Sequence, residues 1–186
     1  MNKSIITTTV LLFMLSAGSM VHAATGSSLN IKTGSFSIND KTQNIGGTTV
    51  TFDDSSDSVF SIEYESAFGK NFSWGVDVLN YSNDILAGSS ANDASSLLIM
   101  GTVRKYFDVS KHVQPYIGGG VGTSVVTIVG SGSGIAFQGM AGIKFPFDSI
   151  SAILEYKFIS SEADDDYGAS IDVSGSGIFA GIAINF

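Results

Sequence analysis

Apolar residues recur at every second position through most of the chain from Ser58 onward. Between residues 60 and 65, for example, Phe, Ile and Tyr alternate with Ser, Glu and Glu. A period of two is typical of β-strands, in which successive side chains point to opposite faces. The pattern therefore predicts seven strands, each with an apolar and a polar face, at residues 60–65, 72–78, 97–104, 113–129, 135–145, 150–158 and 178–186.

An eighth strand is predicted at residues 29–40, where the alternation is weaker. Ile31 lies on one parity, whereas Phe36 and Ile38 lie on the other. A β-bulge near Gly34 would reconcile the two parities, because a bulge inserts one extra residue into a strand. Eight is an even number, as bacterial single-chain membrane barrels require.

The connections between these strands alternate in length. Short ones fall near Gly69, Ser110 and Asp148, whereas longer polar ones fall at residues 41–57, 83–94 and 161–169. The connection at residues 130–133 is an exception, since it is brief. Short turns on the periplasmic side and longer loops outside are typical of a transmembrane β-barrel.

Nine of the 20 aromatic residues lie near the short turns or the C-terminus, which would place them at one end of such a barrel. They predict an interfacial girdle. A soluble β-sandwich would also alternate, but it gives no reason to gather aromatics at one end. The nine residues are Phe68, Phe72, Trp74, Tyr106, Phe107, Tyr116, Phe145, Phe147 and Phe186.

Residues 1–23 are typical of a secretory signal peptide, with Lys3, an apolar stretch at residues 10–15 and a terminal Val-His-Ala. A short membrane anchor is the alternative. The barrel domain would then comprise residues 24–186. Because Lys3 leaves with the signal peptide, the formal charge changes from −8 to −9, which disfavours a nucleic-acid partner.

The amino-acid composition also favours a membrane β-barrel. The 186 residues are 44% apolar but only 14% charged, whereas soluble domains carry about 25% charged residues. Beyond the N-terminus, no apolar run approaches the roughly 20 residues of a spanning helix. The sequence therefore predicts an all-β protein, an eight-stranded antiparallel up-and-down transmembrane β-barrel.

Two segments resemble outer-membrane β-barrels of the family that includes opacity-type surface antigens and OmpX- and OmpW-like proteins. Residues 113–122, VQPYIGGGVG, are similar to a strand common in that family. The final strand, with Ile182, Ile184 and Phe186, is similar to the C-terminal signature that the barrel-assembly machinery recognises. The resemblance implies an outer-membrane location, contact with outer-membrane lipid and lipopolysaccharide, and no particular activity.

The sequence offers few residues that could act in catalysis or bind a metal ion. His112, the single histidine left after residue 23, falls in a periplasmic turn, whereas resemblance to related lipid-modifying barrels would imply a catalytic histidine near the outer leaflet. No catalytic residue and no cofactor are therefore expected. Without cysteine, a zinc site is also disfavoured. Weak candidates for a divalent cation, for which a solvated acidic loop is the alternative, are Glu162, Asp164, Asp165 and Asp166.

Parity also assigns a network of charges to the lumen. Because an eight-stranded bore is just filled by side chains, charges of both signs predict an interlocked plug rather than an open channel. The predicted lumen charges are Glu63, Glu65, Asp77, Arg104, Lys144, Glu155 and Lys157.

These features together predict a monomeric, non-enzymatic outer-membrane protein. Its role would be structural or interactional, such as envelope integrity, adhesion or host contact through acidic outer loops. The outer acids could share divalent cations with the phosphates of lipopolysaccharide. The alternative function is a narrow conduit for small hydrophobic solutes, as the OmpW-like resemblance would allow, and a lateral opening in the wall would distinguish it.

Overall fold

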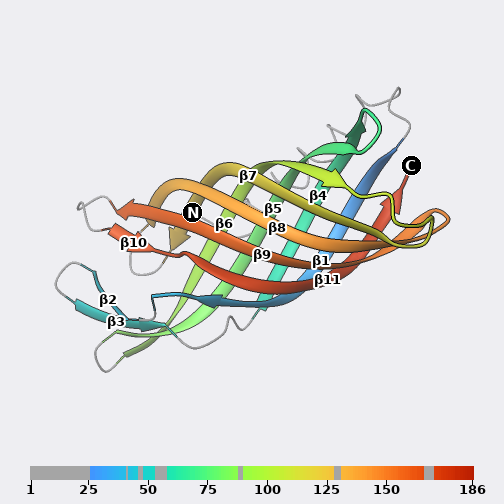
Figure 1. Cartoon of the computed structure of the whole chain (residues 1–186). Helices are drawn as coiled ribbons and strands as arrows, with labels where there is room; N and C mark the ends of the chain where they lie inside the picture. Colours follow the sequence, from blue (N-terminus) through green and yellow to red (C-terminus); the bar gives the residue numbers. More distant parts are fainter. Residues whose placement is uncertain are drawn as a thin grey trace.

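The computed structural model describes residues 26–40, 42–45, 48–52, 58–87, 90–127, 131–165 and 170–186. Eight long antiparallel strands close into a barrel, which confirms the predicted fold class (Figure 1). No helix among these residues is long and apolar enough to cross a membrane. The barrel strands are β1 (Ser27–Ile38), β4 (Ser58–Phe68), β5 (Phe72–Ala87), β6 (Ser90–Tyr106), β7 (Gln114–Thr127), β8 (Ser131–Phe147), β9 (Ile150–Asp165) and β11 (Gly175–Asn185).

The barrel closes between its first and last strands. β1 pairs with β11 over an uninterrupted register, from Ser28 opposite Asn185 to Ile38 opposite Gly175. Because the strands are tilted, the pairing partners form a spiral. When the paired residue is followed from each strand to the next around the barrel, a path that starts at Ser28 comes back to β1 at Ile38, ten residues further along the chain. The path runs through Glu65, Gly75, Thr102, Gly120, Gln138, Ile159 and Gly175.

The two ends of the barrel differ in their connections. At the turn end, which also holds the C-terminus, the strands are joined by short segments. Gly69 and Asp148 supply the positive φ angles, +70° and +58°, that two of these turns need. The opposite end, called the loop end here, carries three further short strands, β2 (Thr42–Ile45), β3 (Thr48–Phe52) and β10 (Ser170–Asp172).

The three longer segments predicted as loops are all partly strand, and residues 41–57 contain β2 and β3. β5 and β6 remain paired from Asn83 opposite Ala94 to Ala87 opposite Ser90, and β9 continues to Asp165. Residues 83–94 lack apolar alternation, yet residues 83–87 and 90–94 remain paired with each other. The pattern failed there because it detects strands only where the two faces differ in polarity.

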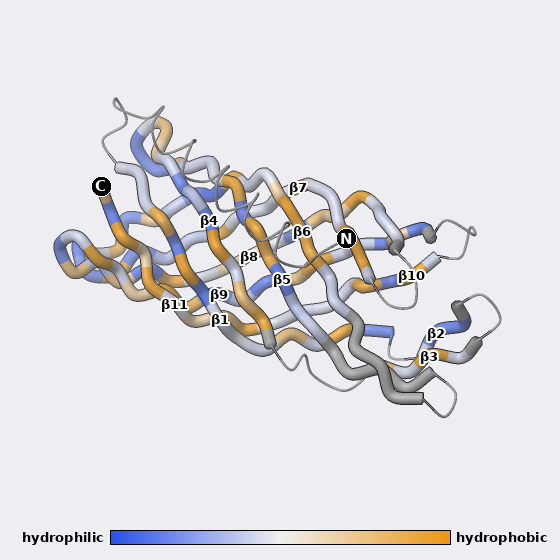
Figure 2. The backbone as a smooth tube through the Cα atoms, turned by 180° about the vertical axis from the view of Figure 1, so that it is seen from behind, coloured by the Kyte–Doolittle hydropathy of each residue, from blue (hydrophilic) through white to orange (hydrophobic). Residues whose placement is uncertain are grey.

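The outward wall of the barrel is apolar, and the alternation along its strands can be followed in Figure 2. Large apolar side chains stand exposed on seven of the eight strands, which is the surface a lipid bilayer would cover. They include Phe60, Trp74, Val103, Val121, Phe137, Leu154 and Ile178.

The predicted bulge near Gly34 is wrong, because β1 keeps one register with β11 throughout. Phe36 and Ile38 are buried and face the lumen on the same parity as Lys32. What changes near Gly34 is the chemistry of the interior, from polar to apolar. The glycine instead permits a close strand approach, since an added Cβ would lie 2.0 Å from the carbonyl oxygen of Ile178.

The predicted aromatic girdle is correct in part. Phe68, Phe72, Trp74, Phe107, Phe147 and Phe186 are exposed near the turn end. Tyr116, by contrast, is buried in the lumen, and Tyr106 donates its hydroxyl to Glu65 there. Both tyrosines lie on the inward parity of their strands, so position along the chain alone misplaced them.

Candidate functional site: the filled lumen

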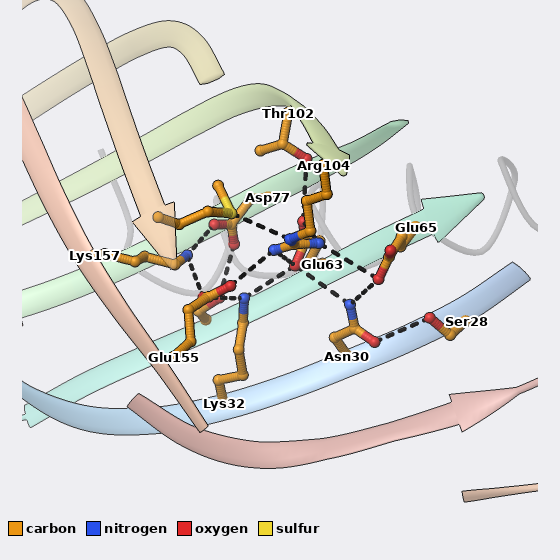
Figure 3. Close-up of polar contacts among 12 residues, drawn as sticks. Ser28, Asn30, Lys32, Glu63, Glu65, Asp77, Thr102, Arg104, Glu155 and Lys157 are labelled. Carbon is orange, nitrogen blue, oxygen red and sulfur yellow. Dashed lines mark hydrogen bonds and ion pairs between the residues drawn. The ribbon is translucent and has the colours of Figure 1, made fainter. Parts of the chain in front are cut away.

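Charged side chains from different strands meet in the turn-end half of the lumen (Figure 3). The Glu63 carboxylate on β4 accepts hydrogen bonds from Lys32 Nζ on β1 at 2.9 Å and Arg104 Nη2 on β6 at 2.7 Å. Thr102 and Asn30 donate to the same carboxylate at 3.1 and 3.3 Å. The Glu63 side chain is fully buried, so its charge is compensated entirely inside the protein.

Glu155 on β9 closes this network. It lies 2.8 Å from Lys32 Nζ and 3.0 Å from Arg104 Nη2. The hydroxyl of Tyr116 donates to it at 2.7 Å. Lys32 and Arg104 therefore each bridge Glu63 and Glu155, and the four groups alternate in sign across the bore.

Glu65 extends the network toward the turn end. It accepts hydrogen bonds from Ser73 Oγ at 2.6 Å and Tyr106 Oη at 2.5 Å. Lys144 Nζ lies 3.9 Å from its carboxylate and donates to Ser28 Oγ at 3.3 Å. Glu65 and Lys144 line an open cavity of about 380 Å³ at the mouth of the barrel.

Asp77 and Lys157 form the side of the network nearest the loop end. Lys157 pairs with Asp77 and lies 3.5 Å from Glu155. Ser61 donates to Asp77 at 2.7 Å, and the Lys157 ammonium stands 5.3 Å from the centroid of the Phe179 ring. The structure thus brings together all seven charges that parity assigned to the lumen.

Lys32 is an eighth lumen charge that the sequence analysis missed. The assumed bulge at Gly34 left the parity of β1 undecided. Ser28, Asn30 and Lys32, polar at every second position, carry the signal that would have revealed it. With Lys32 included, the lumen holds four acidic and four basic side chains, so their formal charges cancel.

The loop-end half of the lumen is apolar. Phe36 stacks on Tyr81, with ring centroids 4.6 Å apart, and Leu79 and Leu98 are fully buried beside them. The Tyr81 hydroxyl donates to the carbonyl oxygen of Val173 at 2.9 Å. The same buried cluster includes Ile38, Val59, Met100, Val126, Ala136, Ile159, Ala163 and Phe179.

Segments outside the barrel wall complete this apolar half. Val50 and Phe52 of β3, together with Ile171 of β10, are buried in the same cluster. The Gln43 side chain joins β2 to β10, donating to the Asp172 carbonyl oxygen at 2.6 Å and accepting from its N–H at 2.9 Å. The loop end is therefore held together by side-chain packing and by hydrogen bonds.

Gln138 lies between the two halves. Its side chain is buried, and neither amide atom has a hydrogen-bond partner among the residues that the structure describes. Burial of an unpartnered amide costs free energy. The boundary therefore carries a buried amide that its described surroundings leave unsatisfied.

The remaining candidate residues lie apart from this network. Glu162 and Asp164 are exposed on β9, and Ser170 donates a hydrogen bond to Glu162. Asp165 is the last residue of β9, and Asp166 lies outside the described residues, as do residues 1–23. Within the described ranges, no group of three or more His, Cys, Asp or Glu could hold a metal ion.

The terminal residues Ile182, Ile184 and Phe186 are exposed on the outward wall. The N–H of Phe186 donates to the carbonyl oxygen of Ser27 at 2.9 Å, and the N–H of Ser27 donates in return at 3.1 Å. The C-terminal apolar row therefore lies at the closing seam between β1 and β11.

Sequence comparisons return nothing for this chain: no protein-family model matches it, and no curated protein matches it. Solved structures do match. The outer membrane protein OprG from Pseudomonas aeruginosa superposes with a TM-score of 0.64 at 14% identity, over 89% of this chain and 97% of that one. Neisserial surface protein A superposes with a TM-score of 0.63 at 14% identity, over 87% and 96%.

A third similar structure is Ail, the attachment invasion locus protein of Yersinia pestis, in complex with the heparin analogue sucrose octasulfate. It superposes with a TM-score of 0.50 at 14% identity, over 87% of this chain and 97% of that one. At such identities the likeness concerns the fold. The chain has the fold of the small eight-stranded outer-membrane β-barrels.

Proposed function

We propose that this chain is a non-enzymatic outer-membrane protein with a structural or surface-interaction role. The observation that carries the proposal is the filled lumen. Paired charges occupy its turn-end half and packed apolar side chains its loop-end half. A bore filled in this way favours a scaffold over a conduit, because a passing solute would have to displace buried, satisfied groups.

The distribution of charge suggests where such a protein would act. The lumen charges cancel, so the excess of acids lies outside the lumen. By their place in the chain, eleven acids belong to the loop end, against a single cation, Lys41. These acids are Asp40, Asp53, Asp54, Asp57, Asp84, Asp93, Glu162, Asp164, Asp165, Asp166 and Asp172.

An acidic loop end favours cationic partners. The Ail structure holds a heparin analogue, sucrose octasulfate, which is a polyanion. This chain is expected to repel such a ligand unless divalent cations intervene. Divalent cations shared with lipopolysaccharide phosphates would tie the loop end to the outer leaflet, and host surface molecules with basic patches would also be suitable partners.

A test of this surface role uses the barrel refolded in vesicles with and without lipopolysaccharide. We expect Mg²⁺ to raise the thermal stability of the barrel only when lipopolysaccharide is present, and EDTA to reverse the effect. If Mg²⁺ and EDTA left the thermal stability unchanged even in vesicles with lipopolysaccharide, the proposed cation bridge would be contradicted.

The non-enzymatic assignment rests on the surroundings of the histidine that remains after residue 23. His112 is exposed in the turn between β6 and β7. Ser110, the nearest serine in sequence, uses its Oγ to accept hydrogen bonds from the backbone N–H groups of His112 and Val113, at 3.3 and 3.1 Å. Its hydroxyl therefore acts as a turn cap, which does not favour a nucleophilic role.

The runner-up function, a conduit for small hydrophobic solutes, draws support from the apolar loop-end half of the lumen. Planar-bilayer conductance of the refolded protein tests the filled barrel, and we expect no steady open level. A complementary assay follows the uptake of a small hydrophobic dye into vesicles. Uptake that requires the folded barrel would favour the conduit and overturn the filled-lumen proposal.

We further infer that Ile182, Ile184 and Phe186 form a recognition signal for the barrel-assembly machinery. Their exposure in one row beside the closing seam supports this role. We expect Phe186→Ala to reduce insertion in cells while leaving spontaneous refolding into detergent intact. Equal insertion of the variant and the parent protein would refute the signal.

A further inference from the structure

Among the residues whose side chains the structure describes, the outward wall of the barrel carries charge at two places. At the loop end, Glu162 and Asp164 are exposed on β9. At the turn end, Lys105 points outward from β6 among apolar neighbours. A lone cation on a lipid-facing wall is costly unless it reaches the headgroup level or finds a partner there.

Two aromatic rings hold Lys105 in place. Its ammonium lies 5.9 Å from the ring centroid of Phe72 and 5.6 Å from that of Phe107. Both distances are within the range of a cation–π interaction. Lys105 forms no ion pair within the described part of the chain, so its N–H donors are available to an oxygen ligand.

Apolar side chains extend along the wall from this position. Phe72 and Ile117 stand opposite Lys105 on the two neighbouring strands. Trp74 and Val103 stand opposite each other one outward position closer to the loop end, and all four side chains are exposed. A cation at the edge of such a surface matches a molecule with an anionic head and a hydrocarbon body.

We propose that Lys105, Phe72 and Phe107 form a binding site for an anionic phospholipid. Lys105 donates hydrogen bonds to the headgroup phosphate, and the acyl chains lie along Trp74, Val103 and Ile117. Two more cations, Lys70 and Lys111, belong to turns at the same end, where Asp108 and Asp148 offset their charge. General attraction of these turns for negative headgroups is therefore weak beside a specific contact with Lys105. The site would anchor the barrel at a fixed depth in the leaflet facing the turn end.

Trp74 makes the site measurable, because it is the single tryptophan of the chain. The full barrel is refolded in phosphatidylcholine vesicles that contain a small fraction of spin-labelled lipid, with the nitroxide close to the headgroup. Quenching of Trp74 fluorescence is compared for labelled phosphatidylglycerol and labelled phosphatidylcholine. We expect phosphatidylglycerol to bind about fivefold more strongly, in line with one well-placed lysine at a membrane surface.

Three variants separate a specific site from general attraction. Lys105→Gln should abolish the preference, and Phe107→Leu should reduce it by about half while keeping every charge. Lys111→Gln removes the same charge from the same end and should leave most of the preference intact. Heat-modifiable gel migration verifies that each variant is folded.

Equal quenching by the two lipids in the parent protein would overturn the proposal. An equal loss of preference in Lys105→Gln and Lys111→Gln would also overturn it, because it would reveal diffuse attraction without a site. A preference that survives in Lys105→Gln would place the anionic lipid elsewhere on the wall.

Discussion

The two halves of the lumen face inward from the same strands, yet they are filled by opposite chemistry. In the turn-end half, Glu63, Glu155, Lys32 and Arg104 satisfy one another through directed contacts of 2.6 to 3.0 Å. In the loop-end half, Phe36, Leu98 and their neighbours make non-directional apolar contacts. Charge pairs tolerate little displacement, whereas apolar packing adapts its shape, so the halves are expected to respond differently to substitution.

The largest effect is expected from removing one charge of the network. Glu63→Gln leaves Lys32 and Arg104 buried with one carboxylate fewer. We expect it to lower the free energy of unfolding by about 3–5 kcal/mol. Urea titration of the barrel in lipid vesicles measures the change, and the exposed Glu162→Gln is the matched control, expected to match the parent protein. A similarly small effect of both substitutions would mean that the network does not stabilise the barrel.

A cavity in the apolar half should cost somewhat less. Leu98→Ala removes a fully buried side chain, and we expect a loss of about 3 kcal/mol in the same titration. Leu97→Ala, on the outward face of the same strand, is the control, and the lipid can fill the space that it leaves. If Leu97→Ala cost as much as Leu98→Ala, the loop-end half would not behave as a packed core.

At the boundary between the halves, the expected sign is reversed. Gln138→Leu replaces an unpartnered buried amide with an apolar side chain of similar size. We expect the free energy of unfolding to rise by about 1 kcal/mol. Gln138→Glu, which introduces a charge at the same place, should lower it. Destabilisation by Gln138→Leu would show that the amide has a partner, such as a bound water.

An effect of similar size is expected for a single hydroxyl. Tyr81→Phe keeps the ring stacked on Phe36 and removes the hydrogen bond to the Val173 carbonyl oxygen, so we expect a loss of about 1 kcal/mol. Amide hydrogen exchange should be faster near Val173 but unchanged near Glu63. Faster exchange in both halves would contradict their independence.

The same contrast explains what the sequence could and could not predict. Where the wall is apolar and the lumen is charged, alternation identified the strands and the inward parity of residues such as Arg104 and Glu155. Where the lumen itself turns apolar, at Phe36 and Ile38, the alternation continues with inverted polarity, because the polar Ser35 and Ser37 face outward. The change of parity was therefore interpreted as a bulge that does not exist. Tyr116 was misplaced for a related reason, because an aromatic ring fits either an interface or a lumen.

Contacts between distant strands could not be predicted from the sequence, for a different reason. Parity showed that Lys157 faces inward, but its pairing with Asp77 depends on tilt and register across the whole barrel. The contribution of β3 and β10 to the apolar half was equally hidden, since Val50, Phe52 and Ile171 occur in segments that read as loops.

The position of Lys32 has a consequence for assembly. β1 and β11 are the first and last strands of the barrel in chain order, and their pairing closes it. A closure that slipped by two residues would preserve the apolar wall, yet it would move Lys32 about 7 Å along its strand relative to Glu155. A buried Lys32 ammonium without its carboxylate partner would raise the free energy of the misaligned barrel. The lumen network would therefore favour the correct register at closure, because a slipped register loses ion pairs although its contact with lipid is unchanged.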